Sequence, residues 1–199
     1  MKSISTTAVC GTAMNVTRPD DRKRTLQKYA LFTYVPVRML QRSSFELQEL
    51  HRSILAFKDG RDFYTRWAAR QFAHALATAD LTDVVIACVP ASSSYSTVRR
   101  WKRFSRLLSG MTGAVDGFDR IQVCGIRNRT HVTGENELAA DINSYVHIDT
   151  GFFRGRKVLV IDDIYTTGKS SDAFISAMES AGANVTMAMF LAKTQRYRG

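Results

Sequence analysis

The stretch from Val158 to Ser170, VLVIDDIYTTGKS, carries the clearest signal for the fold. Four aliphatic residues lead directly into two neighbouring aspartates, Asp162 and Asp163, and small hydroxylated residues follow. An apolar run of this kind is typical of a strand buried on both faces of a parallel sheet. Ligands of such sheets bind at the carboxyl ends of the strands, so the two acids are predicted to lie where a ligand would lie.

Three interpretations of this stretch compete: a surface turn between a strand and a helix, a nucleotide-hydrolysing loop, and a sugar-phosphate site. The ending GKS suggests the nucleotide loop GxxxxGK[ST]. Counting back from Gly168, the first glycine of that motif would fall on Asp163, so the pattern fails. A capped surface turn stays open as the alternative, but it does not account for two carboxylates followed by TTG and a serine.

The residues after the acids are suited to a phosphate. A loop that leads into a helix can point several backbone N–H groups at one anion. Gly168 permits a close backbone approach, and Thr166, Thr167 and Ser170 add hydroxyl donors. Two carboxylates beside a phosphate alone would repel it. They are explained if the ligand also carries hydroxyl groups, because ionised carboxylates accept hydrogen bonds from hydroxyls. Ribose 5-phosphate has both features, and each charge-assisted contact would contribute about 1.5–3 kcal/mol.

Composition limits the classes of protein that fit. At 199 residues with 45% hydrophobic content, one globular domain is expected. The net charge of +10 and a pI near 9.9 favour an anionic partner, which could be a phosphorylated small molecule, nucleic acid or an acidic protein. No apolar run approaches the roughly 20 residues of a membrane span. With no secretory signal pattern and no paired cysteines, we expect a cytoplasmic protein in which Cys88 and Cys124 are buried thiols.

The rest of the chain alternates between strand and helix patterns. Residues 1–28 are polar and are predicted to form a loose or disordered arm before a domain at 29–199. One helix is expected to begin with a capping box of Ser43 and Glu46 and to end at Gly60. The alternation predicts an α/β fold with a mostly parallel sheet flanked by helices. We expect strands near 29–37, 83–89, 120–125, 145–148, 157–161 and 185–192, and helices near 43–60, 62–76, 98–108 and 171–182.

The quoted stretch resembles the phosphoribosyl pyrophosphate (PRPP) motif of type I phosphoribosyltransferases, in which four apolar residues, an acidic pair and a TTG-containing loop follow one another. The resemblance implies that Asp162 and Asp163 bind the ribose 2- and 3-hydroxyls and that residues 166–170 bind the 5-phosphate. It also implies a small N-terminal hood at about residues 29–60, under which an acceptor would bind. The PRPP-binding residues on this interpretation are Asp162, Asp163, Tyr165, Thr166, Thr167, Gly168, Lys169 and Ser170.

Three further segments are similar to the ComF-type, competence-associated branch of that family: VVIACVPASSSYSTVRRWKRF, SILAFKDGRD and IRNRTHVTGEN. The resemblance covers about residues 45–195. Two features depart from the branch. Its Cys-rich zinc ribbon has no counterpart, and its Arg-Gly-Phe-Asn-Gln segment is replaced by Lys102-Arg103-Phe104-Ser105-Arg106.

The same resemblance assigns further roles. A loop after the second strand, Pro90 to Ser93, would bind pyrophosphate, although an ordinary Ser-rich loop is the alternative. Lys102 and Arg103 would join the acidic pair as catalytic residues, while a solvated helix face or a nucleic-acid contact stays open for the basic helix. The residues in these predictions are Pro90, Ala91, Ser92 and Ser93 for the loop, and Arg99, Arg100, Arg127 and Arg129 as anion contacts.

The resemblance implies an enzyme that transfers the phosphoribosyl group of PRPP to a base or an amine and releases pyrophosphate. Mg²⁺ is expected as cofactor, held mainly by PRPP oxygens with no direct protein ligand. The alternative is an effector or regulator that keeps the PRPP fold and binds nucleic acid or a protein, for example in a retron-type defence system. We expect a homodimer or a component of a complex.

Overall fold

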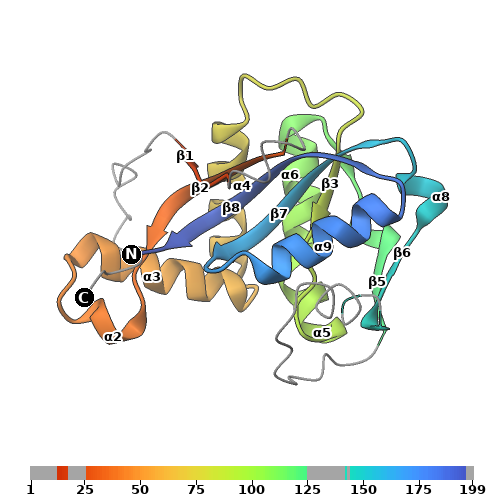
Figure 1. The fold of residues 1–199 in the computed structure, drawn as a ribbon. Helices are drawn as coiled ribbons and strands as arrows, with labels where there is room; N and C mark the ends of the chain where they lie inside the picture. Colours follow the sequence, from red (N-terminus) through yellow and green to blue (C-terminus); the bar gives the residue numbers. More distant parts are fainter. Residues whose placement is uncertain (1–12, 18–25, 125–141, 143, 196–199) are drawn as a thin grey trace.

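The structure is a computed structural model that describes residues 13–17, 26–124, 142 and 144–195. Six strands in these ranges form one sheet in the order β1-β2-β8-β7-β3-β4, and β5 and β6 form a separate pair. Within the large sheet β1 runs antiparallel to β2, and all other neighbours are parallel. Helices cover both faces of this sheet (Figure 1). The predicted α/β fold with a mostly parallel, helix-flanked sheet is therefore confirmed.

The elements have the following bounds. The strands are β1 (Met14–Asn15), β2 (Gln27–Tyr34), β3 (Val85–Cys88), β4 (Val115–Asp116), β5 (Ile121–Val123), β6 (Val146–Ile148), β7 (Lys157–Tyr165) and β8 (Asn184–Thr194). The helices are α2 (Val37–Leu40), α3 (Phe45–Lys58), α4 (Asp62–Ala75), α5 (Ser94–Thr97), the π-helical η1 (Val98–Lys102), α6 (Arg103–Thr112), the 3₁₀-helical η2 (Phe118–Arg120), α8 (Thr150–Phe153) and α9 (Lys169–Ser180). In the described ranges, no helix has both the length and the apolar character that a bilayer crossing requires.

Strand β7 explains the apolar run of the quoted stretch. Val158 and Val160 pack into the core on one face of the sheet, with Phe174 of α9. Leu159 and Ile161 pack into the core on the other face, which α3, α4 and α6 cover. Because successive side chains of a strand point to opposite faces, the part of β7 that lies between two helical layers is apolar at every position from Val158 to Ile161.

Several predicted boundaries differ from the structure. Strand β7 continues past the predicted end at residue 161 to Tyr165, so the two acids lie inside the strand. The basic helical segment starts at Ser94, not near residue 98, and ends at Thr112. The predicted capping residue Ser43 is wrong, because Ser44 accepts the hydrogen bond from Leu47 N at 3.5 Å.

The described part of the predicted arm is attached to the sheet. Residues 14 and 15 form β1, and Val16 and Leu26 are buried in the core. Residues 29–60 contribute most of β2, together with α2 and α3, so the division into arm, hood and domain stays a prediction. Cys88 is buried as expected, whereas Cys124 is exposed because β5 ends before it.

Candidate functional site

A pocket lies where the neighbouring strands β3 and β7 end. The two strands are parallel, with Cys88 opposite Ile161, so the segments that follow them meet at one edge of the sheet. The cavity has a volume of about 280 Å³. Its lining includes Pro90 and Ser92 after β3, Asp162 and Asp163 in β7, and residues 166–170 before and at the start of α9. The structure thus brings the segment after β3 next to the acidic pair and the loop of the quoted stretch, which lie far from it in the sequence.

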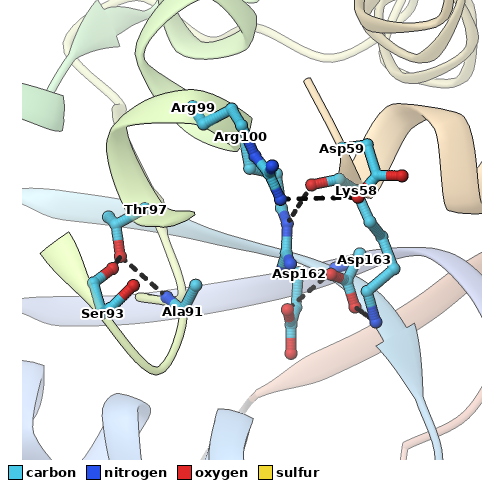
Figure 2. Close-up of polar contacts among 9 residues, drawn as sticks. All are labelled: Lys58, Asp59, Ala91, Ser93, Thr97, Arg99, Arg100, Asp162 and Asp163. Atoms are coloured by element: carbon cyan, nitrogen blue, oxygen red, sulfur yellow. Dashed lines mark hydrogen bonds and ion pairs between the residues drawn. The ribbon is translucent and has the colours of Figure 1, made fainter. Parts of the chain in front are cut away.

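Two cations hold the second acid of the pair (Figure 2). Arg100 Nη1 lies 2.5 Å from Asp163 Oδ2, and Lys58 Nζ lies 3.5 Å from Asp163 Oδ1. Arg100 Nε also donates to the carbonyl oxygen of Lys58 at 3.4 Å. The Asp163 side chain is buried, so its charge is balanced by protein groups and not by bulk water.

Asp162 has a different environment, although it is the adjacent residue. Burial raises its pKa well above the usual value, and the Asp163 carboxylate raises it further. The backbone N–H of Asp163 donates to Asp162 Oδ1 at 2.8 Å, which opposes this rise together with the charges of Arg100 and Lys58. Asp162 faces the pocket with part of its surface accessible. A ligand that donates hydroxyl groups or brings a cation would favour its ionised form.

The loop at residues 166–170 is shaped by one glycine. Gly168 has φ +83°, and a Cβ at this position would lie 2.9 Å from the Tyr165 ring and 3.0 Å from the Asp172 carboxylate. Ser171 Oγ donates to the Gly168 carbonyl at 2.9 Å, and the hydroxyls of Thr166 and Thr194 are 2.8 Å apart. Helix α9 starts directly after this glycine, and Lys169, Ser170 and Ser171 of its first turn line the pocket, so the positive end of the helix dipole lies there. The Lys169 N–H donates to Thr167 Oγ1 at 3.4 Å.

An ion pair behind the loop connects α9 to the sheet. Lys28 in β2 is almost fully buried, at 1% exposed, and its Nζ lies 2.6 Å from Asp172 Oδ1 in the first turn of α9. The acidic residue in this turn also complements the helix dipole. The loop is therefore held from behind, while the hydroxyls of Thr167 and Ser170 are on exposed residues that line the pocket.

The profile of the phosphoribosyl transferase domain family matches residues 63–198, which is more than half of the chain. The chain belongs to this family. None of the curated proteins matches it. One similar solved structure is "Structure of Leishmania donovani UMP synthase", at 18% identity and TM-score 0.40, over 65% of this chain and 22% of that chain. Another is "Structure of the allosteric regulatory enzyme of purine biosynthesis", at 19% identity and TM-score 0.40, over 66% of this chain and 25% of that chain. The chain thus spans about a quarter of their length or less, and the family assignment rests on the profile.

In this phosphoribosyltransferase-family chain, the segment after β3 is largely bonded to itself. The backbone N–H of Ala91 donates to Thr97 Oγ1 at 3.0 Å, and the Thr97 hydroxyl donates to the Ser93 carbonyl at 2.8 Å (Figure 2). Ser93 Oγ accepts from Ser96 N at 3.2 Å and caps α5. Pro90 and Ser92 face the pocket, so they are the members of the predicted pyrophosphate loop that a ligand there would meet first.

The predicted basic residues separate into two groups. Arg100 alone among those of η1 and α6 reaches the pocket. Arg99 pairs with Asp59 at 3.4 Å, and Arg103 Nε lies 2.5 Å from Asp62 Oδ1. Lys102 is exposed and does not line the pocket, so the structure does not bring Lys102 and Arg103 to the acidic pair. Arg127 and Arg129 fall outside the described residues.

Lys58 is the charged residue of the pocket lining that the sequence did not indicate. It is the last residue of α3 and lies in SILAFKDGRD, whose only sequence signal is its resemblance to the ComF-type branch. Nothing in its local pattern points to a carboxylate in a strand much later in the chain. The nearby Gly60 is the one local indication that another segment approaches here. In the structure, a Cβ at this position would lie 2.3 Å from the Arg99 carbonyl oxygen.

The pocket holds few donor groups for a metal ion. Within the described ranges, no group of three or more His, Cys, Asp or Glu side chains is placed to hold an ion. Two adjacent carboxylates are nevertheless oxygen donors of the kind that Mg²⁺ uses beside substrate phosphates. The residues present therefore fit an Mg²⁺ that is bound mainly through a phosphorylated ligand, with Asp162 and Asp163 beside it.

Proposed function

We propose that this chain binds PRPP and transfers its phosphoribosyl group to a nitrogen of a base or an amine, with release of pyrophosphate. One observation carries the proposal: the acidic pair of β7 and the loop at 166–170 line the same pocket, next to Pro90 and Ser92. A ribose 5-phosphate unit offers two hydroxyls to the acids and a phosphate to the loop. The family assignment supports the same reaction class.

The proposed reaction is a displacement at ribose C1. The bond from C1 to the pyrophosphate oxygen breaks, and its electron pair leaves with pyrophosphate. The lone pair of the acceptor nitrogen forms the new C1–N bond, and the proton of that nitrogen passes to solvent. Asp162 and Asp163 hold the ribose hydroxyls and lie near the positive charge that develops on the sugar ring. The helix N-terminus at Lys169 holds the 5-phosphate.

The proposal includes an Mg²⁺ ion that would be bound by oxygen atoms of PRPP. When bound, it supplies positive charge that stabilises the departing pyrophosphate. Asp162 and Asp163 are the protein groups that would face it, directly or through water. The residues themselves orient the sugar, because their carboxylates accept hydrogen bonds from both hydroxyls at once.

We propose that the acceptor binds beside residues 29–60, of which Lys58 lines the pocket. The Tyr34 ring stacks on His51 with centroids 4.8 Å apart. Burial and then the charge of Asp163 raise the pKa of Tyr34. Aromatic rings in this segment would suit a planar base as the acceptor.

Binding and turnover can be measured separately. Calorimetric titration with ribose 5-phosphate, and with PRPP in Mg²⁺, should give saturable binding. Pyrophosphate release should then be assayed with a panel of purines, pyrimidines and amines. Binding without release for every acceptor would reject the transferase, and absence of binding by both phosphoribosyl ligands would reject the site itself.

A second function, nucleic-acid binding by an effector or regulator, is supported by the position of the basic residues outside the pocket. Lys102, Arg103 and Arg106 are exposed on η1 and α6, and the altered 102–106 segment lies in this face.

Replacing all three by alanine should weaken binding to single-stranded nucleic acid. The slope of the logarithm of affinity against the logarithm of salt concentration should become less steep by about two to three. The matched control replaces Arg154, Arg156 and Lys157, which are exposed at the opposite end of β7. Equal effects of the two triple variants would reject a specific surface.

We also propose that the chain acts in the reducing cytoplasm, as a homodimer or within a complex. The free thiols of Cys88 and Cys124 support the first part. Sedimentation of the purified chain at several concentrations tests the second, and a monomer at all concentrations would reject the homodimer.

A further inference from the structure

A basic surface lies outside the pocket, on α4 and on the helical segment formed by α5, η1 and α6. Helix α4 packs against α6 on the face of the sheet that α3 also covers. The exposed cations of this surface are Arg61, Arg66, Arg70, Arg99, Lys102, Arg103 and Arg106, seven in all, and its two exposed acids are Asp59 and Asp62. The excess of five positive charges is half of the net charge of +10, so a large share of the charge of the chain lies here.

Both helical segments carry an exposed aromatic ring that is followed by cations at helical spacing. Phe63 is 61% exposed and precedes Arg66 and Arg70 by three and seven residues. Tyr95 is 73% exposed and precedes Arg99 by four residues, and Arg99 Cζ lies 5.4 Å from the centre of the Tyr95 ring. Residues at these spacings lie on one face of a helix. Neither ring adds much to the core, so a partner can contact both of them.

Ion pairs join the two segments into one surface. Asp62 Oδ2 lies 3.0 Å from Arg66 Nε, and Asp62 Oδ1 lies 2.5 Å from Arg103 Nε. One acid thus holds an arginine of its own helix and an arginine of α6. Asp59, between α3 and α4, holds Arg99 in the same way at 3.4 Å. Because two acids hold three arginines, these side chains are kept in place while the surface stays positive.

The combination of exposed rings and cations favours one class of polyanion. A single-stranded nucleic acid offers a regular series of phosphates and unpaired bases whose flat faces stack on aromatic rings. A duplex keeps those faces within its own stack, and an acidic polypeptide supplies charge without a series of flat rings. The rings and cations of this surface are not part of the pocket lining, so its ligand differs from that of the pocket.

We propose that this surface binds single-stranded RNA or DNA, with Phe63 and Tyr95 stacking on bases and the cations of both helical segments contacting phosphates. The inference rests on the second proposed function and deepens it. It adds α4 to the surface, and it assigns the two aromatic rings to base contact, which cations alone do not supply. RNA and DNA share the chemistry that is recognised.

The test compares strands of equal charge with and without bases. One probe is a single strand of about 12 nucleotides, made as RNA and as DNA, and the other is a DNA strand of the same length that lacks bases. Dissociation constants are measured by fluorescence anisotropy for the wild type and for Phe63→Ala combined with Tyr95→Ala. The wild type should bind strands with bases at least about tenfold more tightly, and the variant should lose most of that difference. Phe45→Ala is the matched control, because Phe45 is 69% exposed at the start of α3, outside this surface.

The cations of α4 give a second readout. Arg66→Gln combined with Arg70→Gln should weaken all strands by the same factor, because all of them carry phosphates. The slope of the logarithm of affinity against the logarithm of salt concentration should become less steep by about one to two. Arg154→Gln combined with Arg156→Gln is the matched control and should change neither quantity, because these exposed residues precede β7 and lie outside this surface.

Equal losses on strands with and without bases would overturn the proposal, as would an equal effect of Phe45→Ala. Tighter binding of a duplex of the same length, or of polyglutamate, would overturn it in favour of that partner. If the wild type binds no nucleic acid, the second proposed function fails as well. If the alanine variant at positions 102, 103 and 106 binds more weakly but the Phe63, Tyr95 and α4 variants do not, that function stands and only this inference is overturned. Thermal unfolding checks that the variants keep the fold, since all the substituted side chains are exposed.

Discussion

The two sides of the pocket are built by different means. On the strand side, Asp163 is buried and Asp162 is partly accessible, and their charges are set by Arg100, Lys58 and each other. On the loop side, residues 166–170 are mostly exposed, and a single glycine with φ +83° sets the shape of the backbone. The strand side therefore depends on side-chain charge, whereas the loop side depends on backbone conformation. The two sides should respond to different kinds of substitution.

The largest effect is expected from Asp163→Asn. The change removes the partner of two cations and one of the two proposed hydroxyl acceptors. PRPP affinity should fall by at least about tenfold, and the free energy of unfolding should fall by about 2 kcal/mol, because two partly buried cations lose their counter-charge. Calorimetry measures the first effect and thermal unfolding the second.

Asp59→Asn is the matched control for this substitution. Asp59 pairs with Arg99 at 3.4 Å, but the pair is on the surface. Its loss should cost less than about 1 kcal/mol and should leave PRPP affinity unchanged. If Asp163→Asn behaved like Asp59→Asn in both measurements, the strand side would not depend on charge in the way described.

The next effect is expected from Gly168→Ala on the loop side. A left-handed backbone costs a non-glycine residue about 1 kcal/mol. The added Cβ would also contact the Tyr165 ring at 2.9 Å, so the loop must shift. We expect ribose 5-phosphate affinity to fall by about tenfold, because the N–H groups would no longer converge on one point.

Gly155→Ala is the control that separates the general cost of a left-handed backbone from an effect on the phosphate-binding loop. Gly155 has φ +74°, and a Cβ there would have no atom within 4 Å. It precedes β7, at the end opposite the acids. This variant should lose about 1 kcal/mol of stability while ribose 5-phosphate binding stays unchanged. Equal binding by the two alanine variants would count against a phosphate site at the loop.

The contrast between the two sides also explains what the sequence could predict. The loop side is local: Gly168 and the start of α9 follow from a short run of residues, and the buried strand follows from Val158 to Ile161. The end of β7 was not predicted, because two aspartates normally end an apolar strand pattern. Lys58 was missed because its partner is distant in the sequence, so only the folded chain brings it to Asp163.

Asp162→Asn should raise the free energy of unfolding, whereas Asp163→Asn lowers it, and the change should be smaller. The folded chain raises the pKa of Asp162 above the ordinary value of 3.8, so the folded state binds this proton more tightly than the unfolded state. The stability that the proton contributes is complete below the ordinary pKa and is lost as the pH rises toward the raised pKa. At about pH 8, asparagine should therefore raise the free energy of unfolding by ~1 kcal/mol, or about 2–4 °C in Tm.

Thermal unfolding across pH checks the sign. The advantage of Asp162→Asn over the wild type should shrink as the pH falls and should vanish near the ordinary pKa, where the aspartate is protonated in both states. A stability difference that does not depend on pH would mean that packing, and not the charge beside Asp163, distinguishes the two side chains.

The smallest effect is expected from Lys169→Ala. Lys169 is exposed at the first position of α9, and the proposed donor to the 5-phosphate is the backbone of this turn, which alanine keeps. Ribose 5-phosphate affinity should fall by less than about threefold, and the difference should disappear at high salt, because an exposed ammonium is screened. Titrations at low and high ionic strength measure this. A loss of tenfold that persists in salt would place the ammonium group itself on the phosphate. The loop side would then depend on side-chain charge as the strand side does, and the difference between the two sides would no longer hold.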